Sequence, residues 1–262
     1  MNMHKSKLIV TVTIITFLFL LIPLIMIIVS SFGTDSIIKF PITGFTFDWY
    51  VKVFKSRTFM AGLKTSITLA FAASLIGIII ALPTSYALSK RKTKISKKLL
   101  SYFLSPNLIP GIVMGYVLFH ALVLTLKLSI PVSLLVGHLL IVLPFSIRLL
   151  AASFDTMDDS IEEAALTLGC SPLMSFFKVV LPNLVSPLVV AMLMSFINSF
   201  NNLPVSMYLK GPGVTTLPLA LMNHLEFNFD PTISAISVLL MIVTFGLMIF
   251  VDKTAGIASI AK

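Results

Sequence analysis

Long apolar runs without Asp, Glu, Lys or Arg dominate the chain, and short polar segments separate them. Six runs occur, at residues 8–34, 65–89, 99–126, 128–148 apart from its last residue, 179–209 and 231–251. Each holds about 20 residues or more, the length that a helix needs to cross roughly 30 Å of hydrocarbon. Their apolar residues are continuous, whereas membrane barrel strands alternate over short stretches. The pattern predicts an all-α integral membrane protein with six transmembrane helices.

Three of the runs have features of their own. The first begins with basic residues like a signal peptide, but its apolar stretch is long and no small-x-small site follows it, so we expect a retained helix. Pro106, Pro110 and Gly111 predict a kink or an unwound turn in the third run. The fourth run contains His138 and Pro144 and is the least regular of the six.

Composition excludes the common soluble classes. Of the 262 residues, 57% are hydrophobic and 11% charged, whereas soluble domains carry about a quarter charged residues. Disorder requires low hydrophobicity, so it is excluded as well. The single cysteine, Cys170, cannot form an internal disulfide, and no Cys/His cluster has the spacing of a structural metal site. The net charge of +9 therefore points to orientation in a membrane rather than to nucleic acid.

The most basic loop fixes the expected orientation. Residues 90–98 hold six cations, and burying them at about 2.5 kcal/mol each would cost roughly 15 kcal/mol. The positive-inside rule places this loop in the cytoplasm, and with six spans both termini lie there too. Contact with anionic lipid is the alternative use of the cations. Trp49 and Tyr50 then fall in an outer segment, where interfacial aromatic residues are common.

The segment between the fourth and fifth runs, residues 151–182, has the signals of two short helices. Ser160 and Glu163 form a capping box that predicts a helix from Ile161, with Asp158, Asp159, Glu162 and Glu163 favouring its N-terminus. Gly169 should end this helix, and Ser171-Pro172 should start the next. Ile161, Ala164, Ala165 and Leu168 are predicted to form one stripe that another protein can approach closely.

Within this segment, Glu163-Ala164-Ala165, Gly169 after three residues and Val179-Val180-Leu181-Pro182 after nine more resemble the EAA motif. That motif marks the permease subunits of binding-protein-dependent ABC importers, and Val179 in place of the usual Ile is the one departure. We call residues 151–182 the EAA segment. The resemblance implies that it is a coupling helix seated on an ATP-binding subunit. The residues so implied are Glu162, Glu163, Ala164, Ala165, Leu168, Gly169, Leu181 and Pro182.

Weaker similarity extends over residues 60–252 and looks like the spermidine/putrescine branch of these importers. The chain reads Ser199-Phe-Asn-Asn where polyamine permeases often carry acids in the last two positions, which weakens a cationic substrate. The resemblance implies a type I importer permease with a first helix and outer segment at 1–59, a five-helix core at 60–252 and a cytoplasmic tail at 253–262. It also implies multi-pass insertion in a bacterial cytoplasmic membrane.

The same resemblance implies the other subunits. They are a second permease subunit, two ATP-binding subunits and an extracytoplasmic substrate-binding protein. No Walker A sequence occurs, so ATP and Mg²⁺ should bind to the partner ATPase, with no cofactor and no catalysis in this chain. An ion-coupled secondary transporter or channel subunit is the alternative, but all ten acids lie outside the six runs. An intramembrane enzyme would have only His120 and His138, which more commonly hydrogen-bond between helices.

Four asparagines are candidates for the solute path. Asn198, Asn201 and Asn202 are spaced to share one face of the fifth helix, and Asn107 lies beside the prolines of the third run. Amides in hydrocarbon need partners, so these side chains should face protein or a water-filled path. Either role, lining the path or hydrogen-bonding between helices, remains open at this point.

Overall fold

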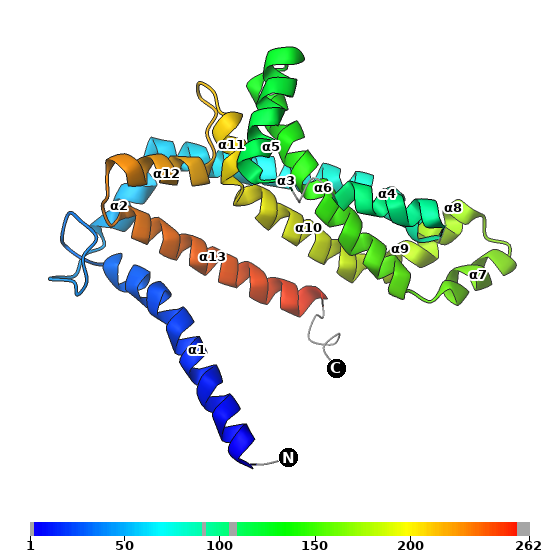
Figure 1. Ribbon diagram of the computed structural model, residues 1–262, viewed down its shortest axis with the longest axis horizontal. Coiled ribbons are helices and arrows are strands. Elements are labelled where there is room, and N and C mark those ends of the chain that lie inside the picture. The colour runs from blue at the N-terminus through cyan, green and yellow to red at the C-terminus, as the bar shows by residue number, and fades with distance from the viewer. Residues whose placement is uncertain (1–2, 91–92, 105–108, 256–262) are drawn as a thin grey trace. The chain divides into compact units, whose positions relative to one another are not determined.

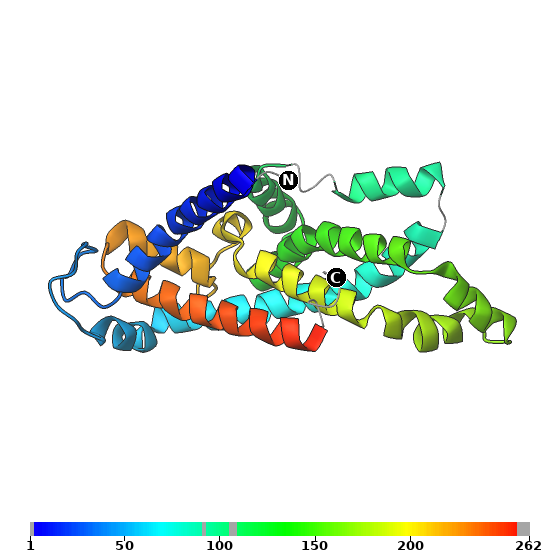
Figure 2. The same ribbon diagram turned by 90° about the horizontal axis from the view of Figure 1, so that it is seen from below.

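The computed structural model describes residues 3–90, 93–104 and 109–255, and every regular element in these ranges is a helix (Figures 1 and 2). The helices of the N-terminal half are α1 (Met3–Ser30), α2 (Asp48–Lys55), α3 (Arg57–Lys90), α4 (Lys94–Leu104), α5 (Gly111–Leu118) and the π-helix η2 (Phe119–Thr125). Those of the C-terminal half are α6 (Ile130–Thr156), α7 (Asp159–Thr167), α8 (Pro172–Ser175), the π-helix η3 (Phe176–Val180), α9 (Leu181–Asn183), α10 (Val185–Phe200), α11 (Leu203–Tyr208), α12 (Leu217–Phe227) and α13 (Thr232–Ala255). The predicted all-helical class is confirmed.

Three described helices are long and apolar enough to cross a membrane: Ile9–Ser30 within α1, then α3 and α6. The bent pair Pro172–Asn183 and Val185–Phe200 makes a fourth candidate, and Gly111–Thr125 and Thr232–Gly246 are shorter apolar helices. The count of six spans and the cytoplasmic position of both termini remain predictions.

Two predicted spans differ in detail. The third is interrupted as expected, since Pro110 lies outside α5 and Gly111 begins it. The fifth is not one continuous helix: the chain bends by 71° at Leu184, and α10 ends at Phe200. Pro182 and Pro187 flank the break, and proline removes a backbone donor that a continuous helix would use. The predicted 90–98 loop is also partly wrong, because Lys94 begins α4.

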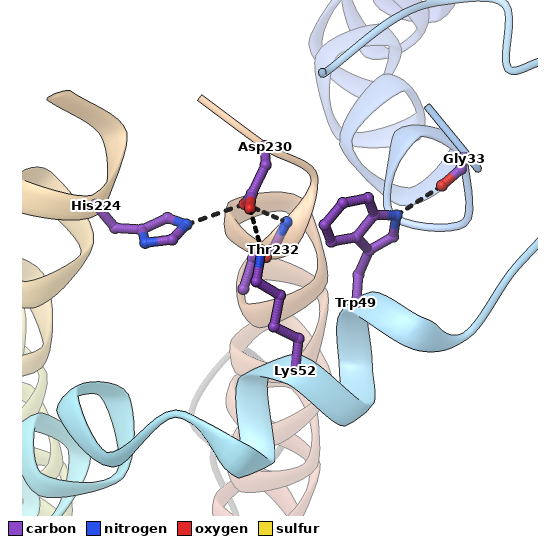
Figure 3. A network of polar contacts seen from close by, with 6 residues as sticks. All are labelled: Gly33, Trp49, Lys52, His224, Asp230 and Thr232. Carbon is purple, nitrogen blue, oxygen red and sulfur yellow. Dashed lines mark hydrogen bonds and ion pairs between the residues drawn. The ribbon is translucent and has the colours of Figure 1, made fainter. Parts of the chain in front are cut away.

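The chain forms two compact units, and the first comprises the N-terminal part up to Met60 with Ala220–Leu247. Its polar centre is Asp230, whose carboxylate accepts hydrogen bonds from Lys52 Nζ at 2.5 Å and the Thr232 backbone N–H at 3.1 Å, and lies 2.9 Å from His224 Nε2 (Figure 3). Burial alone would raise the pKa of Asp230, but these hydrogen bonds outweigh it and lower the pKa to about 2. The carboxylate therefore joins α2, α12 and α13 as an anion.

The second unit comprises Ala61–Leu219 and the chain from Met248, and α6 runs through its core. Small polar residues let the helices approach closely. Ser146 Oγ lies 2.7 Å from Ser195 Oγ of α10, and Ser85 of α3 donates to the Ile147 carbonyl at 3.0 Å. Interfaces rich in small residues are typical of helices that pack within a membrane.

Candidate functional site

The first helix of the EAA segment begins at Asp159, two residues earlier than predicted. Asp158, not Ser160, is the N-cap of α7, and its carboxylate accepts the Ser160 backbone N–H at 2.9 Å. This hydrogen bond holds the pKa of Asp158 below its usual value. The predicted capping box of Ser160 and Glu163 is therefore wrong, because an aspartate two residues upstream reaches the free N–H groups first.

Gly169 ends α7 as predicted. Its φ is +89°, and the Cys170 N–H donates to the Ala165 carbonyl at 3.1 Å while the Gly169 N–H donates to the Leu166 carbonyl at 3.0 Å. This pair of bonds is a Schellman motif, which satisfies the last carbonyls of a helix. An added Cβ at Gly169 would meet no atom within 4 Å, so only the left-handed backbone requires glycine here.

After Gly169, a second helix begins at Ser171-Pro172 as predicted. Ser171 caps α8 by accepting the Met174 backbone N–H at 3.3 Å, and Pro172 is in the first turn. Leu181 and Pro182 form α9 immediately before the 71° bend, with Leu181 half-buried and Pro182 exposed. In both ribbon views α7, the first short helix of the EAA segment, lies beyond the end of α6 (Figures 1 and 2).

Glu162 is the buried carboxylate of the EAA segment, with a side chain that is 6% exposed. One of its oxygens accepts a hydrogen bond from the Tyr86 hydroxyl, and the other pairs with Lys90 Nζ at 2.7 Å. Lys90 also pairs with Asp159 Oδ1 at 2.7 Å. Because Tyr86 and Lys90 lie at the end of α3, two ion pairs and the hydrogen bond of a phenol attach α7 to that helix.

The ring of Tyr86 continues this attachment with apolar contacts. It packs edge-on against Phe154 of α6 and Phe176 of η3, with ring centroids 5.4 Å and 5.0 Å apart. Phe154 belongs to a buried cluster with Val180 and Leu184, and Tyr86 and Phe176 pack against this cluster. Tyr86 thus contacts the EAA segment on both sides of the Gly169 bend, so the two short helices are held as one body.

One stripe along the exposed surface of α7 and its C-cap is apolar. Ile161 is 41% exposed, Leu168 is 85% exposed, and Ala164 lies exposed between them. Ala165 is buried beside the chain's own helices, so the predicted stripe of four residues is wrong in that member. Glu163 is exposed, one position from the buried Glu162. We call Ile161, Ala164 and Leu168 the exposed face of α7.

The predicted asparagine face does not form. Because α10 ends at Phe200, Asn201 follows the helix and Asn202 is the N-cap of α11, accepting the Val205 backbone N–H at 3.1 Å. Asn198 and Asn201 are exposed, whereas Asn202 is half-buried. Asn202 lines a hollow together with Ile109, Gly111, Met114, Leu140, Ile141 and Val205. Asn107 lies outside the described residues.

His138 has the role expected of a helix-packing residue. It is 1% exposed, and its ring nitrogens lie 2.8 Å from Ser199 Oγ of α10 and 3.1 Å from Ser206 Oγ of α11. It therefore joins α6 to both helices around the α10–α11 break. His120 is exposed, and no group of three or more metal-ligating residues occurs among the described residues.

Comparison with known protein families identifies the family of this chain. The sequence pattern of the family described as "Binding-protein-dependent transport system inner membrane component" matches residues 73–254, which include the whole EAA segment. The chain belongs to this family. It is a membrane permease subunit of a binding-protein-dependent ABC importer.

Individual relatives are similar to this chain in sequence or in fold. It is 25% identical to the spermidine/putrescine transport system permease protein PotC of Haemophilus influenzae, over 90% of this chain and 91% of that protein. An 85-residue stretch is 35% identical to the putrescine permease PotI of Escherichia coli, covering 32% of this chain and 30% of PotI. Its fold matches a chain of a bacterial ABC transporter that imports the acidic polysaccharide alginate, with TM-score 0.75, 20% identity and coverage of 97% and 98%.

Proposed function

We propose that this family member forms half of the translocation pathway for a small polar solute and couples it to ATP hydrolysis in a separate subunit. Its partners are a second permease subunit, two ATP-binding subunits that hold ATP and Mg²⁺, and an extracytoplasmic substrate-binding protein. The observation that carries the proposal is the two-sided construction of α7. Glu162 fixes one side to Tyr86 and Lys90, and the opposite side exposes Ile161, Ala164 and Leu168.

This construction suits the transmission of force. An exposed apolar helix face outside the spans is a docking surface for a protein groove. When the ATP-binding subunits close, α7 moves with them, and the ion pairs to Lys90 carry the displacement to α3. Packed elements with two discrete arrangements convert such shifts into a switch between inward- and outward-facing pathways.

The proposed substrate is a small polar solute, polyamine-like or related. The chain is similar to PotC and PotI, whose names assign them to spermidine/putrescine and putrescine transport systems. The hollow at Asn202 presents an amide among apolar side chains, and the described residues that line it include no acid. A neutral amide can hydrogen-bond a passing solute without holding it as a carboxylate would hold a cation.

We also propose six spans with both termini in the cytoplasm of a bacterial inner membrane. Single cysteines in a Cys170→Ser background test this orientation with an impermeant thiol reagent on intact cells. Ile95, which is 70% exposed, should stay unlabelled, and the exposed Ser36 should react. Labelling at position 95 alone would reverse the orientation and remove the EAA segment from the cytoplasm.

Reconstitution tests the function itself. The permease, its genomic neighbours and the binding protein are placed in proteoliposomes with ATP inside, and uptake of putrescine, spermidine and neutral polar solutes is measured together with ATP hydrolysis. The proposal predicts ATP-dependent uptake that also requires the binding protein. Uptake driven by an ion gradient without ATP would contradict it and favour the secondary transporter.

A further inference from the structure

We propose that α2 and the residues before it form an anchor in the membrane–water interface, with one side in contact with phospholipid. This inference concerns the first unit and does not depend on coupling to an ATPase. It starts from the arrangement of residues around α2, an eight-residue helix with three distinct sides.

One side of α2 is held by its own chain. Val53 is buried at 1% exposure, and the Trp49 indole N–H donates to the Gly33 carbonyl at 2.6 Å (Figure 3). The Tyr50 hydroxyl lies 2.7 Å from Ser31 Oγ. The two aromatic residues that the sequence suggested as interfacial therefore attach α2 to the end of α1.

A second side is apolar and exposed. Phe47, Val51 and Phe54 are 59%, 47% and 62% exposed, and their spacing of four and three residues places them on one face. Phe45, 64% exposed, extends this surface, with its ring centroid 5.2 Å from that of Phe47. We call these four residues the aromatic side. Four large apolar side chains would be costly to leave in water.

The third side is charged. Asp48, Lys52 and Lys55 are exposed, and their spacing of four and three residues places them on one face of the helix. Lys52 Nζ is fixed by Asp230 and lies 5.0 Å from the centre of the Trp49 ring. A helix whose charged side adjoins an exposed apolar side has the character of helices that lie in the plane of a membrane surface, where lysines meet lipid phosphates.

The depth of the aromatic side favours phospholipid over a protein partner. In the apolar stretch of α1, Ile9–Ser30, every residue before Ser30 is exposed or half-buried, and Phe32 follows the end of the stretch by two residues. Phe32 stacks on Phe45 with centroids 4.9 Å apart and meets Phe47 edge-on at 5.4 Å. The aromatic side therefore lies at the level where an exposed membrane helix ends, which is where aromatic belts occur.

Spin-label accessibility tests the proposal on the full chain in phospholipid nanodiscs. In a Cys170→Ser background, nitroxides are placed by Val51→Cys and Phe54→Cys, with Lys55→Cys as the matched control on the charged side. All three positions are exposed, so the labels fit without repacking. Collisions with oxygen, which concentrates in lipid, and with a water-soluble nickel chelate are measured at each.

We expect oxygen to dominate at positions 51 and 54 and the nickel chelate at position 55, a reversal between adjacent residues. Dominance of the nickel chelate at 51 and 54 would show that the aromatic side faces water. Exclusion of both reagents there would show a protein partner instead. Either of these results would overturn the proposal.

Discussion

Lys90 and Glu162 are 72 residues apart in sequence, yet Lys90 Nζ lies 2.7 Å from Glu162 Oε2. The pair joins the end of α3, a membrane helix, to the buried side of α7 in the EAA segment. Glu162 is the buried member, at 6% side-chain exposure, and losing a buried ion pair costs more than an exposed one contributes.

Glu162→Gln tests this attachment. The amide still accepts from Tyr86 but removes one of the two ion pairs of Lys90, which keeps only Asp159, so we expect the purified complex to lose about 1–3 kcal/mol of stability. Glu163→Gln is the matched control, because Glu163 is adjacent and exposed. Thermal unfolding of both variants checks the prediction, and equal melting temperatures would contradict it.

Gly169→Val tests the bend. A β-branched residue at φ +89° should cost about 1–2 kcal/mol or adopt another backbone conformation that moves α7. Gly213→Val is the matched control, since Gly213 has φ +73° and equally open surroundings but lies outside the EAA segment. We expect similar losses of stability in both variants, with binding-protein-stimulated ATP hydrolysis falling only in Gly169→Val. Normal stimulation there would separate the bend from coupling.

Much of the EAA segment was predictable because its signals are local. The end of α7 at Gly169 and the cap at Ser171 depend on neighbouring backbone groups, and both predictions are confirmed. The first cap was misassigned because Asp158 and Ser160 are both good caps, and which N–H each can reach is decided by geometry.

The attachments between distant segments could not be predicted in the same way. The sequence pattern placed Tyr86 near the end of the second span and Lys90 at the start of the basic loop. Nothing in their spacing indicates Glu162 as their partner. The fifth span resembled one apolar run, because hydropathy does not distinguish a straight helix from one bent by 71°. Asn202 therefore became a cap in the structure rather than part of a helical face.

The Asp230 network predicts a pH dependence. Folding lowers the pKa of Asp230 from 3.8 to about 2, so its contribution to stability is complete above pH 4 and is lost as pH falls through about 2. Asp230→Asn should flatten the fall in unfolding temperature between pH 5 and pH 2.5. Asp48→Asn, at an exposed position on α2, should leave that fall unchanged. Parallel pH profiles for wild type and Asp230→Asn would contradict the assignment.

Substitutions at Asn202 and Asn201 should distinguish the capping of α11 from contact with the solute. Asn202→Leu removes the cap of α11, at about 1 kcal/mol, and also the amide in the hollow. Asn202→Asp keeps a capping carboxylate and so should keep stability. We expect lower uptake per folded complex for Asn202→Leu and unchanged uptake for Asn201→Leu. The opposite order would place the solute on the exposed side of the α10 end.

Photo-crosslinking from the exposed face of α7 measures the central claim most directly. A photoreactive phenylalanine derivative replaces Leu168, which is 85% exposed, or Phe227, which is 81% exposed and belongs to α12 of the other unit. In cells that make the whole transporter, we predict a covalent adduct with the ATP-binding subunit from position 168 and none from position 227. Absence of that adduct at 168, or equal adducts at both positions, would contradict the account.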